Sequence, residues 1–163
     1  MMKAIVTVLL VFLAALPAQG REVAGFSGTW CLDEGESDYR DLQQPEARRD
    51  AIVDHGDRIT DEIVATARGR AQHVTLDLPT DGSVVRFPER TVLGTSTLRT
   101  AAARREGGTL VVTQEVRTGD TLRVAVMRWA LSADRARLVM TVAAEDGRHV
   151  VGTLVFRRGV PSR

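Results

Sequence analysis

The sequence predicts a mainly β fold, an antiparallel up-and-down meander with one helical segment near residues 45–69. Two observations favour it. Apolar residues alternate with polar residues in several short segments, as in strands that turn one face toward a core. In the second half of the chain, turn-forming residues separate these segments at intervals of about 10–15 residues, with none of the crossover helices that a parallel sheet needs.

The first predicted strand lies at residues 26–33, where apolar or small residues occupy every second position: Phe26, Gly28, Trp30 and Leu32. An acidic loop follows at 33–41. Its carboxylates are of the type that calcium takes as ligands, but their spacing matches no recognised calcium-binding loop. We therefore predict no metal site in this loop.

The segment 45–69 has two interpretations. Pro45 and Glu46 are typical of a first helical turn, and a stripe spaced by 4, 3, 4 and 4 residues follows: Ile52, Gly56, Ile59, Ile63 and Ala67. Against a helix, His55-Gly56-Asp57 is typical of a turn, and Ile59 and Ile63 can also alternate within a strand. We predict one helix or two short ones, which cover an open end of the β structure or form a lid over a ligand.

From Gln72 onward the segments are typical of strands. Val74, Leu76 and Leu78 alternate with polar residues, and later strands are expected at 110–116, 122–131, 138–144 and 149–157. The 122–131 segment is apolar on both faces. We therefore expect a cover on its outer side, provided by the helical segment.

A meander of this length must protect its edge strands or close on itself. Closure would place Trp30 beside Phe156-Arg157-Arg158. Gly28-Thr29-Trp30 and these closing arginines resemble the two ends of lipocalin-like, calycin-type barrels, which open with a Gly-x-Trp strand and end with an arginine packed over that tryptophan. Together with Trp129–Asp134, they are still more similar to small exported bacterial proteins of the lipocalin-like kind.

The resemblance extends over most of residues 26–158. It implies a lipocalin-like barrel of about 8–10 strands. It also implies that Gly28 and Trp30 close the barrel together with Arg157 or Arg158, so that a large apolar ring and a guanidinium stack on each other.

The N-terminus predicts export. Lys3 provides a positive start, residues 4–16 are apolar except for Thr7, and Ala18 and Gly20 are small residues at the usual cleavage spacing. Such a stretch is too short to span a bilayer. We predict a signal peptide at 1–20 and one domain at 21–163, located in the periplasm or secreted, with no membrane span after cleavage.

Charge limits the partners of this domain. Lys3 is the only lysine, and residues 21–163 carry 21 arginines and 21 acidic residues. A formal charge near zero argues against nucleic acid or an anionic membrane as the main partner. We expect a small hydrophobic ligand or an envelope protein instead, and no cofactor.

No recognised catalytic motif is present, so we predict no catalytic residues. Cys31 is the single cysteine and has no intramolecular disulfide partner. It is a partly buried thiol or an intermolecular link. Its use as a nucleophile would require a base, and the three histidines are scattered along the chain.

The leading hypothesis is an exported, non-enzymatic domain that binds a small apolar molecule inside a barrel. Trp129 and Met127 are the candidate ligand contacts, although an aromatic residue in a strand is more often part of the core. The alternative is a side-chain-filled barrel that binds or inhibits another protein through its loops or edge. An enzyme with an unsignalled site is the third hypothesis.

Overall fold

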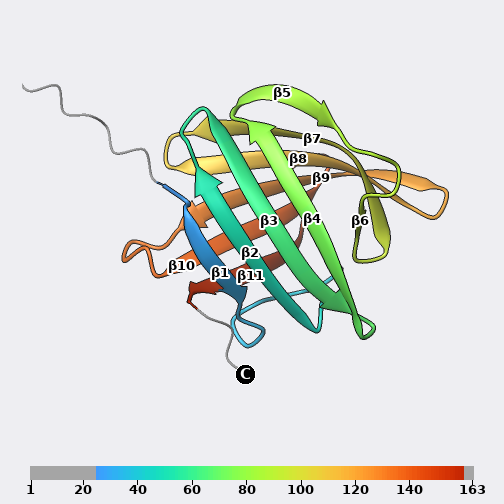
Figure 1. The fold of residues 1–163 in the computed structure, drawn as a ribbon, viewed down its shortest axis with the longest axis horizontal. Coiled ribbons are helices and arrows are strands. Elements are labelled where there is room, and N and C mark those ends of the chain that lie inside the picture. Colours follow the sequence, from blue (N-terminus) through green and yellow to red (C-terminus); the bar gives the residue numbers. More distant parts are fainter. Residues whose placement is uncertain (1–24, 160–163) are drawn as a thin grey trace, which may run out of the picture.

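Residues 25–159 are described by the computed structural model, and they form one antiparallel sheet that curves into a nearly closed barrel (Figure 1). The strand order is β4-β3-β2-β1-β11-β10-β9-β8-β7-β5, with β6 paired to β7. The predicted signal peptide, residues 1–20, lies outside the described residues. The predicted antiparallel meander is confirmed, because every neighbouring pair along this path is antiparallel.

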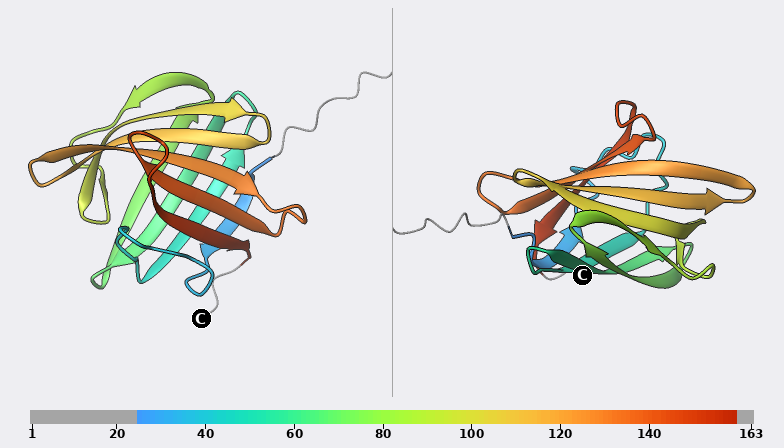
Figure 2. Two further views of the ribbon diagram at one scale, coloured as in Figure 1. Left: turned by 180° about the vertical axis from the view of Figure 1, so that it is seen from behind. Right: turned by 90° about the horizontal axis from the view of Figure 1, so that it is seen from above.

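The eleven strands are β1 Gly28–Leu32, β2 Ala47–Asp54, β3 Arg58–Ala67, β4 Arg70–Pro79, β5 Asp81–Arg86, β6 Val92–Leu93, β7 Ser96–Glu106, β8 Thr109–Thr118, β9 Thr121–Leu131, β10 Arg137–Ala144 and β11 Val150–Arg158. Figure 2 shows how β2–β4 and β7–β10 form two layers whose strands cross. Between these layers lies the core, built from the alternate residues that each strand turns inward.

The predicted helix at 45–69 is wrong, because this segment contains the whole β2–β3 hairpin. The turn is His55-Gly56-Asp57, where Gly56 has a φ of 88°. Period-two alternation was hidden because the inward positions of the two strands carry buried acids, Asp50 and Asp61, among the isoleucines. The helical spacing of Ile52, Gly56, Ile59, Ile63 and Ala67 is therefore a coincidence of two strands and the turn between them.

Two further expectations need correction. Residues 25–159 form eleven strands where about 8–10 were expected, and one of them, β6, has only two residues. The outer side of β9 has no helical cover in residues 25–159, and Leu122 is 51% exposed. Across this range we find no helix with the length and hydropathy that a membrane span requires.

The sheet path ends at β4 and β5, so closure between them depends on other contacts. Gln72 of β4 makes one such contact with the Gly94 backbone between β6 and β7. Its amide Nε2 donates to the Gly94 carbonyl oxygen at 2.9 Å, and the Gly94 N–H donates to Gln72 Oε1 at 2.6 Å. A side-chain amide thus makes the two hydrogen bonds that a neighbouring strand would make.

Candidate functional site

The interior of the barrel has a packed half and a hollow half. The packed half contains the largest buried side chains, among them Phe26, Trp30, Trp129 and Phe156. Phe26 and Trp129 pack there in an edge-to-face arrangement, with ring centroids 6.4 Å apart and an interplanar angle of 80°. The Trp30 indole N–H donates to the Phe26 carbonyl oxygen at 2.8 Å.

The Gly-x-Trp strand and the last strand meet in this packed half. The Arg158 guanidinium lies over the Trp30 ring, 4.5 Å from its centroid. Gly28 has a φ of 146°, and a Cβ added there would lie 2.9 Å from Arg158 Nη1. Only glycine combines this backbone conformation with so close an approach of the arginine. Arg157 points elsewhere and forms ion pairs with Asp33 and Glu36 of the acidic loop.

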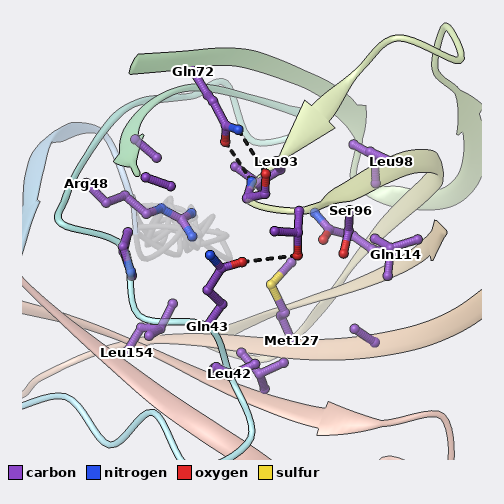
Figure 3. Close-up of a pocket in the computed structure, with 18 residues that line it drawn as sticks. Leu42, Gln43, Arg48, Gln72, Leu93, Ser96, Leu98, Gln114, Met127 and Leu154 are labelled. Atoms are coloured by element: carbon purple, nitrogen blue, oxygen red, sulfur yellow. Dashed lines mark hydrogen bonds between the residues drawn. The ribbon is translucent and has the colours of Figure 1, made fainter. Parts of the chain in front are cut away.

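The hollow half contains a cavity of about 240 Å³ (Figure 3). Its wall is mostly apolar and includes three alanines where the packed half has aromatic rings. The lining residues are Leu42, Gln43, Pro45, Arg48, Ala65, Ala67, Gln72, Leu93, Gly94, Thr95, Ser96, Leu98, Gln114, Val116, Ala125, Met127, Val142 and Leu154. The space exists because small side chains on β3 and β9 leave it unfilled.

The β1–β2 connection, residues 33–46, forms one side of this cavity through Leu42, Gln43 and Pro45. Its backbone is held on β11, since Asp38 and Thr153 exchange N–H···O bonds of 2.8 and 2.7 Å. Gly152 makes room for this crossing, because a Cβ there would collide with the Leu42 side chain. Across the cavity wall, the Thr95 hydroxyl donates to Gln43 Oε1 at 3.1 Å.

Arg48 is the one charged side chain among those that line the cavity. Its Nε and Nη2 donate to the two carboxylate oxygens of Asp50 at 2.8 and 2.7 Å, and its guanidinium lies 5.3 Å from the Phe156 ring centroid. Burial alone would lower the pKa of Arg48, but the Asp50 carboxylate raises it, so the guanidinium stays charged.

Asp61 lies behind this pair and is fully buried. Within the described part of the chain, neither of its carboxyl oxygens has a hydrogen-bond partner. Burial, followed by the nearby negative charge of Asp50, raises the pKa of Asp61 well above its ordinary value, although Arg48 opposes the shift. The protonated form is therefore strongly favoured compared with an exposed aspartate.

Gln114 is the second buried polar side chain at the cavity, at 6% exposure. It occupies an inward position of β8 between Val112 and Val116. Figure 3 shows it among the side chains that line the cavity. An amide in this position offers a donor and an acceptor to a bound molecule.

The sequence-predicted candidates fall in different places. Met127 lines the cavity, whereas Trp129 is one inward position away in the packed half, 1% exposed and against Phe26. Sequence reasoning missed Arg48 and Gln114. Gln114 had a signal, because it interrupts an alternating run of inward valines. Arg48 gave no such signal, because it lies on β2, and the sequence predicted a helix for that segment.

The other reactive groups lie away from the cavity. All three histidines are exposed, and Cys31 is partly buried, with its Sγ 3.1 Å from the Gly159 carbonyl oxygen. Burial raises the pKa of the Cys31 thiol. Asp33 and Glu36 of the acidic loop bind arginines, and no cluster suited to a metal ion occurs in residues 25–159.

No protein-family model matches the sequence, and no curated protein sequence matches it either. Among solved structures, the chain is similar to human cRBP IV, a cellular retinol-binding protein, with a TM-score of 0.52 and 18% sequence identity. The match covers 82% of this chain and 98% of the human chain.

The fold is lipocalin-like. This result confirms the barrel type that the terminal motifs implied. At 18% identity the likeness concerns the fold alone, so the chemistry of this cavity rests on its own residues.

Proposed function

We propose that this protein is an exported, non-enzymatic binding protein that holds a small, mainly apolar molecule in the cavity of its hollow half. The observation that carries the proposal is the wall of this cavity. Apolar side chains surround the space, and two polar groups, the largely buried Arg48 and the buried Gln114, face it without filling it. Concave apolar sites with a few fixed polar groups are typical of small-molecule binding.

The fold supports the same class of function. The similar human protein is named as a retinol-binding protein, and this name describes binding of a small molecule. Of the alternatives, a side-chain-filled barrel is disfavoured by the unfilled space at Met127 and Ala125. An enzyme is disfavoured because the carboxyl with the raised pKa, Asp61, does not line the cavity and the histidines are exposed.

Native mass spectrometry of the full chain expressed in a bacterial host tests the proposal. The folded protein should carry an adduct of up to a few hundred daltons that is lost on denaturation. Ala125→Phe places a ring in the cavity and should abolish the adduct. Ala130→Phe is the matched control, because Ala130 lies on the same strand with the opposite orientation and should leave the adduct in place.

An empty folded protein that also fails to take up apolar dyes in solution would contradict the binding function. Equal dye uptake by both variants would place the binding site outside this cavity. The same spectra test export, since cleavage after Gly20 leaves a chain without residues 1–20. A mass that retains those residues would contradict the periplasmic or secreted location.

A further inference from the structure

The charge of the cavity wall bears on the class of ligand, provided that the proposed binding function holds. A buried arginine in an apolar cavity would by itself favour a carboxylate or phosphate, because its guanidinium matches their geometry. In this barrel, however, the positive charge of Arg48 is already paired with Asp50, although some of its N–H donors remain unused. Asp50 accepts two hydrogen bonds from it and is itself fully buried.

The Arg48–Asp50 pair has no net charge, and within residues 25–159 no other charged side chain lines the cavity. An incoming anion would have to displace Asp50 or add a second negative charge beside it in a poorly solvated interior. The first alternative leaves a buried carboxylate without its partner, and the second brings two like charges together in a poorly solvated interior. Both are unfavourable.

Asp61 adds to this barrier from behind the pair. It is 0% exposed and interacts electrostatically with both Asp50 and Arg48. When it is protonated, the three groups sum to zero, and when it ionises they sum to −1. In neither state does the interior present a positive charge to a ligand.

The polar groups that remain free suit an uncharged head group. The Gln114 amide, which lines the cavity, carries a donor and an acceptor, and Arg48 uses only Nε and Nη2 toward Asp50. A hydroxyl or carbonyl group can bond to either side chain without bringing charge into the interior. We propose that the cavity selects an uncharged amphiphile, such as an alcohol, over an anionic one of the same length.

The test compares three probes that differ only in their head group. The cavity volume equals roughly eight water molecules at ~30 Å³ each, and a methylene group is of similar size, so an eight-carbon chain fits. Isothermal titration calorimetry of the full chain at neutral pH should show octanol binding about tenfold or more tighter than octanoate. Octylammonium should also bind more weakly than octanol, because no unpaired carboxylate lines the described cavity wall to neutralise its positive charge.

Octanoate or octylammonium binding as tightly as octanol would overturn this inference while leaving the binding function intact. If none of the three binds and the native mass spectrum shows no adduct, the binding function fails and the inference fails with it.

Asp50→Asn tests the cause of the selectivity. It keeps an acceptor for Arg48 but removes the charge, so octanoate should gain about tenfold in affinity while octanol changes by less than about threefold. Asp120→Asn, in an exposed turn, is the matched control and should change neither. A folded Asp50→Asn protein with unchanged octanoate affinity would overturn the assignment to Asp50. If that variant does not fold, the comparison of probes on the unmodified protein still decides the inference.

Discussion

Replacing the buried carboxyl of Asp61 should change how the stability of this barrel depends on pH. Asp61 is fully buried, its oxygens have no hydrogen-bond partner in residues 25–159, and its pKa is raised well above 3.8 by burial and by Asp50. Asp61→Asn keeps the size and polarity of the side chain but cannot ionise. The comparison therefore isolates the cost of the charge.

The sign follows from proton binding. Because the folded pKa is raised, the folded protein holds the Asp61 proton more tightly than the unfolded chain does. Below the unfolded pKa both states are protonated and Asp61 contributes no pH dependence. Above it, the unfolded chain releases the proton first, so the free energy of unfolding falls as pH rises until the folded pKa is reached. The slope in this window is about 1.4 kcal/mol per pH unit.

Urea unfolding at several pH values between about 4 and 8 measures this slope. The stability difference between Asp61→Asn and the unmodified protein should grow with pH and then level off, and the plateau marks the folded pKa. Histidines and other titrating groups cancel in the difference. Asp120→Asn should give a constant difference over the same range. Parallel stability curves for Asp61→Asn would refute the assignment of a raised pKa to this carboxyl.

Three further substitutions test the packing. Gly28→Ala should lower the free energy of unfolding by about 1–3 kcal/mol, measured in urea, because it strains a φ of 146° and displaces Arg158. Leu110→Ala should cost about 2–5 kcal/mol in the same assay, because Leu110 is 0% exposed in the core. Gln72→Ala should remove both hydrogen bonds to Gly94 and lower the free energy of unfolding by about 1–3 kcal/mol. It should also speed hydrogen exchange of the Gly94 amide. Unchanged exchange would show that this contact does not connect β4 to the β6–β7 connection.

The strands of the second half were predictable because their inward positions are consistently apolar. In β10, for example, Leu138, Met140 and Val142 are buried at every second residue. The turn at Asp146-Gly147 was predictable for a local reason, since Gly147 has a φ of 66°. The lipocalin-like fold was predictable from the two chain ends, where Gly28 and Trp30 meet Arg158.

The β2–β3 hairpin was not predictable by the same rule. Alternation identifies a strand only when the inward positions are apolar, and β2 turns Arg48, Asp50 and Asp54 to the same side as Ile52. These polar groups are tolerated inside because they satisfy one another in space. Asp50 binds Arg48, and Asp54 binds Arg105 of β7, which is 51 residues away. The Asp54–Arg105 pairing spans too much of the chain to leave a local signal, and the Arg48–Asp50 pair puts charges at inward positions where alternation requires apolar residues.

The cavity depends on a contrast in side-chain volume between the two halves of the barrel, which no single strand reveals. Along β9, Trp129 fills the packed half and Ala125 borders the hollow half, with Met127 between them. Each residue is ordinary for a strand. The space forms only because Ala65 and Ala67 of β3 line the same cavity as Ala125. Arg48 is costly in a barrel interior that aliphatic side chains could fill. Its position next to unfilled space, with Gln114 facing that space from β8, favours a binding site over incomplete packing as the explanation of the cavity.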